Sequence, residues 1–244
     1  MTTRALAEVA VVEDASALAE AAARRLIARV TGKDRAAICL TGGSSPVGLY
    51  RLLAAKPWRD QIPWDRVHWF IGDDRFVPQS DPLSNMGTAR RIFLDSVGTP
   101  PANIHPIATD ATDPETAAHL YEDSLKAFYG AGQFDPARPL FDLVLMGLGG
   151  DGHTASLFPR SPALAEKDRC VLGIAKAGTE PFVPRVTLTL PALASTREML
   201  FLVDSADKRA ILGRVLAGAD LPAHHAYSDG ELVWLIIRAA APEN

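Results

Sequence analysis

Cysteine is scarce in this chain, which has only Cys39 and Cys170 among its 244 residues. Each of them lies in or beside an apolar, strand-like run, which is typical of a small core residue. Their spacing matches no metal-ligand motif. A chain of this length can bury a substantial core without cross-links, so we expect neither a disulfide-dependent scaffold nor a bound metal.

Long hydrophobic runs are also missing. No segment approaches the roughly 18 consecutive apolar residues that a membrane-spanning helix needs. The first residues lack the charged-then-apolar layout of a signal peptide. We therefore expect a cytoplasmic protein that has no contact with a membrane.

Positive charge is not in excess, because 25 Lys and Arg stand against 29 Asp and Glu and give a net charge of -4. The basic residues are scattered, which argues against a nucleic-acid partner. The length would suit one large α/β domain or two small ones. No repeat or linker divides the chain, so we expect a single domain over residues 1–244. Nothing in the sequence sets the oligomeric state, and a monomer is the simplest expectation.

The sequence does contain a regular alternation of strand-like and helix-like segments. Apolar or alternating runs predict strands at residues 8–12, 36–40, 67–71, 141–146, 171–174, 186–190, 199–203 and 232–237. Helical spacing, caps and glycine stops predict helices at residues 16–30, after Pro46 with Ser45 as the cap, at 85–93, at 114–129 and after Ser205. Such alternation indicates an α/β fold with a mostly parallel sheet covered on both faces.

The most informative segment covers residues 143–153. Its apolar half predicts a strand buried on both faces, and the glycines that follow let a ligand approach the main chain closely. Residues 147–152 match the G-x-G-x-x-G dinucleotide fingerprint by letter, but no acidic residue follows the strand at 171–174 to hold a ribose. We therefore expect no nucleotide cofactor. A plain turn and a catalytic loop remain, and His153 favours the catalytic loop.

Polar clusters follow the carboxyl ends of several predicted strands. They comprise residues 41–45, 73–75, 151–153 and 205–208. The carboxyl ends of parallel strands share one edge of a sheet, where ligands of open α/β folds bind. These clusters are therefore expected to converge on one crevice.

Three of these clusters suit a phosphate group. Gly42, Gly43 and Ser44 precede a predicted helix and supply backbone N–H groups, a hydroxyl and the positive end of the helix dipole. Lys208 could add a mobile point charge. Arg75 offers a bidentate fork for phosphate or carboxylate, although it could equally pair with the adjacent aspartates. An ordinary capped turn at 41–45 and a solvated lysine at 208 remain the alternatives.

His153 and Asp151 suit proton transfer. A histidine can accept a proton near neutral pH, and an aspartate two residues away can fix its tautomer or bind a substrate hydroxyl. A serine nucleophile has less support, because no G-x-S-x-G elbow occurs.

Together these motifs resemble the 6-phosphogluconolactonase family. The matching segments are Thr41–Pro46, Gly72–Pro78, Ser84–Asn85, Gly147–Pro159 and Pro184–Thr189, within residues 10–237. The resemblance implies hydrolysis of 6-phosphogluconolactone in the pentose phosphate pathway, without a metal or cofactor. It also implies a three-layer α/β/α fold shared with glucosamine-6-phosphate deaminase. The family commonly has threonine at position 45, where this chain keeps a hydroxyl as Ser45.

The resemblance also suggests roles for individual residues. His153, positioned by Asp151, would take a proton from the attacking water. The residues expected to contact the phosphosugar are Gly42, Gly43, Ser44, Asp73, Arg75, Arg185 and Lys208.

Two other functions are alternatives to lactone hydrolysis. The deaminase carries a catalytic glutamate five residues after the histidine, and this chain has Phe158 there, which favours the lactonase. A non-catalytic sugar-phosphate sensor would be expected to add a DNA-binding segment, and no helix-turn-helix or basic extension is visible in the sequence.

Overall fold

The computed structural model describes residues 7–242, in which strands and helices alternate along the chain. The strands are β1 (Glu8–Val12), β2 (Ala36–Leu40), β3 (Val67–Ile71), β4 (Asp73–Arg75), β5 (Leu143–Gly147), β6 (Val171–Ile174), β7 (Arg185–Leu188), β8 (Glu198–Val203) and β9 (Glu231–Ile237). The α-helices are α1 (Ala15–Val30), α2 (Val47–Ala54), α3 (Asn85–Ala89), α4 (Pro114–Tyr129), α5 (Leu190–Ala194), α6 (Arg209–Leu216) and α7 (Pro222–His225).

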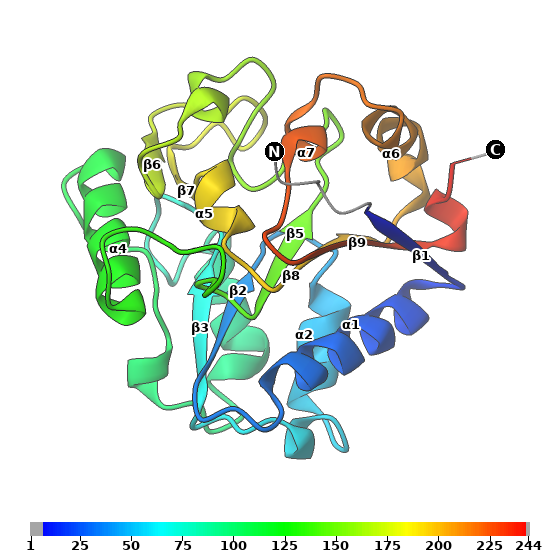
Figure 1. Cartoon of the computed structure of the whole chain (residues 1–244), viewed down its shortest axis with the longest axis horizontal. Coiled ribbons are helices and arrows are strands. Elements are labelled where there is room, and N and C mark those ends of the chain that lie inside the picture. The colour runs from blue at the N-terminus through cyan, green and yellow to red at the C-terminus, as the bar shows by residue number, and fades with distance from the viewer. Residues whose placement is uncertain (1–6, 243–244) are drawn as a thin grey trace.

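Six strands form a parallel central sheet in the order β1-β9-β8-β5-β2-β3. In Figure 1, α1 and α2 lie below this sheet, and α6 and α7 lie above β8 and β9. This arrangement confirms the predicted α/β fold with a mostly parallel sheet between helical layers. No helix in the described part of the chain is long and apolar enough to cross a membrane.

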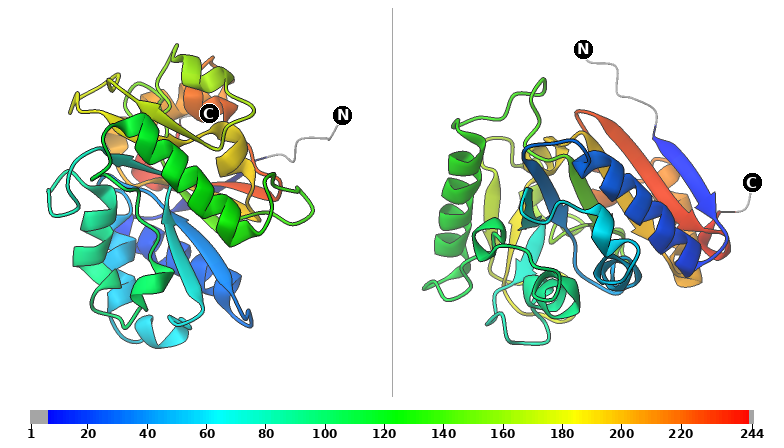
Figure 2. Two further views of the ribbon diagram at one scale, coloured as in Figure 1. Left: turned by 90° about the vertical axis from the view of Figure 1, so that its left-hand side faces the viewer. Right: turned by 90° about the horizontal axis from the view of Figure 1, so that it is seen from below.

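A second, smaller sheet joins β4, β7 and β6 in antiparallel pairs. Helix α4 packs against β6 and β7, as Figure 2 shows. The sequence pattern predicted residues 73–75 only as a polar cluster after a strand, because three charged residues carry no hydrophobic period. The strand predicted at residues 186–190 ends earlier, at Leu188. Thr189 instead caps α5, because its Oγ1 accepts the N–H of Ala192.

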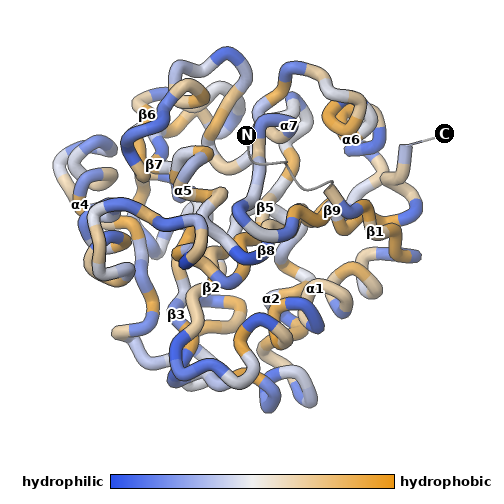
Figure 3. Tube along the Cα trace, in the orientation of Figure 1, coloured by the Kyte–Doolittle hydropathy of each residue, from blue (hydrophilic) through white to orange (hydrophobic). Residues whose placement is uncertain are grey.

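Local sequence accounts for the principal elements. Every residue of β2 is buried, as its unbroken apolar run requires. The buried face of α1 includes Leu18, Ala22, Leu26 and Val30, four residues apart, and Asp14 caps its first turn. Figure 3 shows the hydrophobic residues along β2, β8 and β9, where the buried side chains form the core.

The strand order contains one point at which the chain changes its direction along the sheet. The chain leaves β2 toward β3 on one side of the sheet, whereas β5 is followed by β8 and β9 on the other side. The carboxyl ends of β2 and β5 therefore flank the point where the direction of winding reverses. Open α/β sheets leave a crevice at such a point, because the two connecting loops diverge from each other.

Candidate active site

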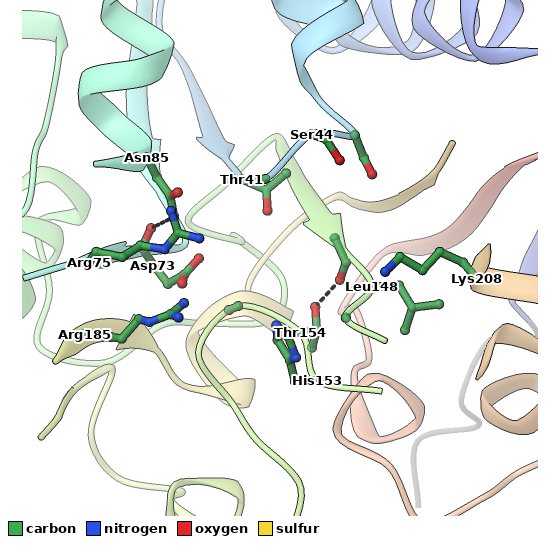
Figure 4. A pocket seen from close by; sticks show the side chains of 16 residues that line it. Thr41, Ser44, Asp73, Arg75, Asn85, Leu148, His153, Thr154, Arg185 and Lys208 are labelled. Atoms are coloured by element: carbon green, nitrogen blue, oxygen red, sulfur yellow. Dashed lines mark hydrogen bonds between the residues drawn. The ribbon is translucent and has the colours of Figure 1, made fainter. Parts of the chain in front are cut away.

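A cavity of about 200 Å³ opens at this crevice. It is lined by loops that follow β2, β5 and β8, by residues of β4 and β7 and by the first residue of α3 (Figure 4). Its walls include the predicted residues Gly42, Gly43, Ser44, Asp73, Arg75, His153, Arg185 and Lys208. Asp151 is the one predicted site residue outside the lining, and it contacts the ring of His153. The expected convergence of the four clusters on one crevice is therefore observed.

The loop after β2 brings Gly43 and Ser44 to the cavity. Gly43 has a φ of 86°, a conformation that a glycine adopts without strain. Ser45 does not cap α2 as predicted. The cap position is Pro46, without a side-chain hydrogen bond, and the Ser45 hydroxyl instead donates to Oδ1 of Asp204 at 2.6 Å. That hydrogen bond fastens the loop after β2 to the loop after β8.

The loop after β5 folds back on itself to present His153. The N–H of Gly149 donates to the His153 carbonyl at 2.8 Å, and the Thr154 hydroxyl donates to the Gly147 carbonyl at 2.8 Å (Figure 4). A Cβ atom at position 149 would lie 2.1 Å from the His153 Nδ1 atom. Position 149 therefore has to be glycine for the imidazole to occupy its place.

Asp151 holds the imidazole of His153 on one side. Its Oδ1 atom lies 2.5 Å from Nδ1 of His153 and also accepts the backbone N–H of that residue at 3.0 Å. Partial burial would raise the pKa of Asp151, but the hydrogen bonds and positive charge of His153 outweigh burial and lower it. The carboxylate is therefore ionised at neutral pH, and Nε2 is the ring nitrogen left to face the cavity.

Phe158 packs beside the imidazole. It is buried, with its ring centroid 5.1 Å from that of His153 and 5.7 Å from the guanidinium carbon of Arg185. A phenyl ring in this place confines the histidine and transfers no protons.

The adjacent carboxylates Asp73 and Asp74 have different contacts and different roles. Asp73 lines the cavity and accepts the Ser156 hydroxyl at 2.6 Å. Asp74 accepts the backbone N–H groups of Arg75, Asn85 and Met86 and thereby fixes the start of α3. Burial raises the pKa of Asp74 to about 6, and the N–H donors of Asn85 and Met86 oppose that shift.

Arg75 and Arg185 lie directly opposite each other on the paired strands β4 and β7. Neither forms an ion pair with an aspartate among residues 7–242. The Arg75 Nη1 instead donates to the Leu83 carbonyl at 2.7 Å, and the Arg185 Nη2 donates to the Pro181 carbonyl at 3.1 Å. The pairing of Arg75 with an adjacent aspartate, left open by the sequence, is therefore not observed.

These two guanidinium groups form a site for negative charge. Both Nε atoms are buried without a hydrogen-bond partner in the described structure. Burial lowers the pKa of Arg185, the carboxylate of Asp73 opposes the shift, and the charge of Arg75 adds to it. Like charges directly opposite on paired strands repel each other, and a buried unpaired donor is costly. An anion between the two arginines would relieve both penalties.

Lys208 reaches the cavity from the other side. It ends a short 3₁₀ turn (Ala206–Lys208) and directly precedes α6. Its Nζ lies 3.5 Å from Oδ2 of Asp207 and would lie 3.9 Å from a Cβ atom at Gly150. In Figure 4, Lys208 and the two arginines occupy opposite sides of the cavity, with His153 between them.

One lining residue to which the sequence assigned no role is Asn85. Its Nδ2 donates to the Asp73 carbonyl at 2.9 Å, and its Oδ1 occupies the space that a Cβ atom at Gly42 would need, 2.0 Å away. Asn85 therefore links the loop after β2 to β4. The only sequence signal for Asn85 is the Ser84–Asn85 dipeptide, which is among the motifs on which the family resemblance is based. Among residues 7–242, no three His, Cys, Asp or Glu side chains are grouped to hold a metal ion.

Comparison with known proteins agrees with this architecture. A family model described as "Glucosamine-6-phosphate isomerases/6-phosphogluconolactonase" matches residues 12–234. A 6-phosphogluconolactonase of Synechocystis is 42% identical over 222 residues, which cover 88% of each chain. Its counterpart in Mycobacterium tuberculosis is 39% identical over 239 residues, 93% of this chain and 94% of the relative.

A solved structure extends the likeness to the fold. The crystal structure of 6-phosphogluconolactonase from Thermotoga maritima aligns with a TM-score of 0.82 and 29% sequence identity, over 96% of this chain and 100% of that chain. The resemblance inferred from the sequence motifs is confirmed. The chain belongs to the glucosamine-6-phosphate isomerase/6-phosphogluconolactonase family.

Proposed function

We propose that this protein hydrolyses 6-phospho-D-glucono-1,5-lactone to 6-phosphogluconate in the oxidative pentose phosphate pathway. The observation that carries the proposal is the Asp151–His153 pair, which faces a cavity that has cationic groups on two opposite sides. A phosphorylated lactone requires these features, because a base must activate water and two separate oxygen groups carry or develop negative charge.

The 6-phosphate binds on the side formed by Gly43, Ser44 and Lys208. Backbone N–H groups and a hydroxyl at the turn before α2 suit phosphate oxygens, and the lysine adds a positive charge. Gly42 shapes the turn by leaving room for Asn85. Asp73, buried beside the cavity, contacts a sugar hydroxyl.

His153 acts as the general base. Its Nε2 takes a proton from water while the water oxygen forms a bond to the lactone carbonyl carbon. The carbonyl oxygen becomes an oxyanion, which Arg75 and Arg185 stabilise on the opposite side of the cavity. The bond between that carbon and the ring oxygen then breaks, and His153 returns its proton to the ring oxygen. Asp151 stabilises the imidazolium during this sequence.

The same site does not suit the deaminase reaction of the related enzymes. Ring opening and loss of an amine need an additional acid–base group, which the resemblance places at the position of Phe158. Here that position holds a buried phenyl ring against His153.

A direct assay distinguishes the two reactions. Purified protein should hydrolyse 6-phosphogluconolactone above the spontaneous rate in the presence of EDTA, because a histidine base and water suffice. It should release no ammonia from glucosamine 6-phosphate. Ammonia release, or a lactonase activity that EDTA abolishes and a divalent ion restores, would contradict the proposal.

We also propose that the whole chain works as one domain, as a monomer in the cytoplasm, without a nucleic-acid or membrane partner. Its net charge of -4 with scattered basic residues supports the absence of nucleic-acid binding. Light scattering of the purified protein at the concentration used for assays tests the monomer.

A further inference from the structure

A second cavity of about 200 Å³ lies at the opposite edge of the central sheet. Its lining comes from the segments that precede β2, β5 and β8, from the first residues of β2 and from the end of α4. We call it the amino-edge cavity. The same three adjacent strands carry the candidate active site at their carboxyl ends, so the two cavities are separated by the length of the strands. A strand of five residues spans about 16 Å.

Cationic side chains dominate the amino-edge cavity. Lys33, Arg35, Arg138 and Arg197 line it, and Asp142 is the carboxylate in its lining. The protein as a whole is acidic, with a net charge of -4, so this concentration of positive charge is local. A cleft lined by one sign of charge focuses the electrostatic field and attracts ions of the opposite sign.

Asp142 does not neutralise this cluster. Its Oδ1 pairs with Lys33 and lies 3.3 Å from Nε of Arg197, and its Oδ2 accepts the N–H of Ala37 at 2.8 Å. One carboxylate thus serves two of the cations and a backbone donor. In the described part of the chain, no carboxylate lies within 4.0 Å of the guanidinium nitrogens of Arg35 or Arg138. A surplus of positive charge remains in the cavity.

Aromatic rings hold those two arginines in place. The guanidinium of Arg35 lies 4.3 Å from the ring centroid of Phe128, and that of Arg138 lies 3.9 Å from the centroid of Tyr129. A guanidinium that stacks on a ring uses its face and leaves its N–H edge available. Arg138 spends part of that edge on the Tyr129 carbonyl, to which its Nη1 donates at 3.2 Å.

The loop that carries Arg138 is itself fixed. The hydroxyl of Tyr129 donates to the Arg138 carbonyl at 2.8 Å and accepts the N–H of Asp135 at 2.8 Å. Ordered cations lose less conformational entropy when they bind an anion than free side chains do.

We propose that the amino-edge cavity binds a small, multiply charged anion that bears phosphate groups. Stacked arginines present forks that match phosphate oxygens, and Lys33 and Arg197 add charge around the shared carboxylate. The site is separate from the candidate active site and does not depend on the lactonase proposal.

Calorimetric titration with inorganic pyrophosphate tests this site. The protein carries Lys208→Ala to weaken binding at the candidate active site. Adding Arg35→Gln and Arg138→Gln should raise the Kd for pyrophosphate about 10-fold or more, since two charge-assisted contacts are lost. Arg51→Gln with Arg214→Gln removes the same charge from exposed positions on α2 and α6 and should change the Kd less than about 2-fold. Arg35→Gln alone is a milder change at an exposed position and should still raise the Kd about 3-fold.

Each other outcome overturns the proposal. Absence of pyrophosphate binding in the Lys208→Ala protein would show that the amino-edge cavity does not bind this anion. An equal loss of affinity in the Arg51 and Arg214 control would show that pyrophosphate binding depends only on the overall charge of the protein. An unchanged Kd after replacement of Arg35 and Arg138 would remove these residues from any anion site.

Discussion

The carboxylate of Asp151 holds His153 at two points, its ring and its backbone. One oxygen, Oδ1, lies 2.5 Å from the ring Nδ1 and 3.0 Å from the backbone N of the same histidine. The two contacts fix the direction of the ring relative to the loop that carries it. Because Nδ1 faces the carboxylate, a proton can be exchanged with substrate only through Nε2. In the proposed mechanism the pair acts as one unit, in which the negative charge of Asp151 stabilises the imidazolium that forms when water is deprotonated.

Asp151→Asn removes the negative charge beside His153 and keeps the shape of the side chain, so it tests the contribution of the charge alone. The amide oxygen can still accept the N–H of His153, but the negative charge is lost, so kcat should fall about 10- to 100-fold with little change in KM. Asp123→Asn, at an exposed position on α4, is the matched control. A wild-type kcat in the Asp151→Asn protein would exclude this role.

Lys208→Ala should act on substrate binding. KM for the phosphorylated lactone should rise about 10-fold or more, because a phosphate dianion loses its ammonium partner. KM for the unphosphorylated glucono-1,5-lactone should change far less. Arg214→Ala, an exposed change on neighbouring α6, controls for the loss of one positive charge. Equal effects on the two lactones would place Lys208 outside the phosphate site.

Phe158→Glu should destabilise the protein without creating a deaminase. The ring is buried and packs beside His153 and Arg185, so a glutamate there loses the apolar contacts of the ring and buries a charged group, which costs about 2 kcal/mol or more of the free energy of unfolding. Phe158→Leu keeps an apolar side chain and should lose less stability. Urea unfolding of both variants and an ammonia assay with glucosamine 6-phosphate provide the measurements. Release of ammonia from glucosamine 6-phosphate by a folded Phe158→Glu protein would contradict this prediction.

Asp74 should impose a pH dependence on stability. Burial raises its pKa to about 6 in the folded protein, above the unfolded value of about 3.9. Between these values the folded state holds a proton that the unfolded state has released. The contribution of Asp74 to stability is therefore full below about pH 4 and is lost as the pH rises through about 6.

The variant Asp74→Asn lacks this titration. Its free energy of unfolding, relative to that of the wild type, should increase by about 2 kcal/mol between pH 4 and pH 7. Chemical denaturation of both proteins across that range measures the difference. A flat or decreasing difference would mean that the hydrogen bonds to Asp74 outweigh its burial.

Sequence patterns predicted the central sheet because its strands are rich in apolar residues. The residues at their carboxyl ends could then be placed together by topology alone. Strand β4 escaped prediction, since Asp73–Arg75 becomes a strand only by pairing with β7, which lies more than 100 residues along the chain. The opposition of Arg75 and Arg185 follows from that pairing.

Contacts between distant loops were also beyond the sequence pattern. The hydroxyl of Ser45 satisfies the rule for a helix cap, yet it bonds to Asp204, a partner 159 residues away. The hydrogen bond between Ser45 and the Asp204 carboxylate therefore replaces the helix cap that the local sequence favours. The position of Asn85 against Gly42 likewise depends on how β4 and the loop after β2 approach each other.

The central claim is that His153 is the base that activates water for lactone hydrolysis. Its most direct test is the turnover of 6-phosphogluconolactone by His153→Ala, with the spontaneous hydrolysis subtracted and His119→Ala, an exposed histidine on α4, as the control. We expect kcat to fall about 100-fold or more while KM stays within about 3-fold of the wild-type value. Wild-type turnover by the His153→Ala protein would contradict the central claim.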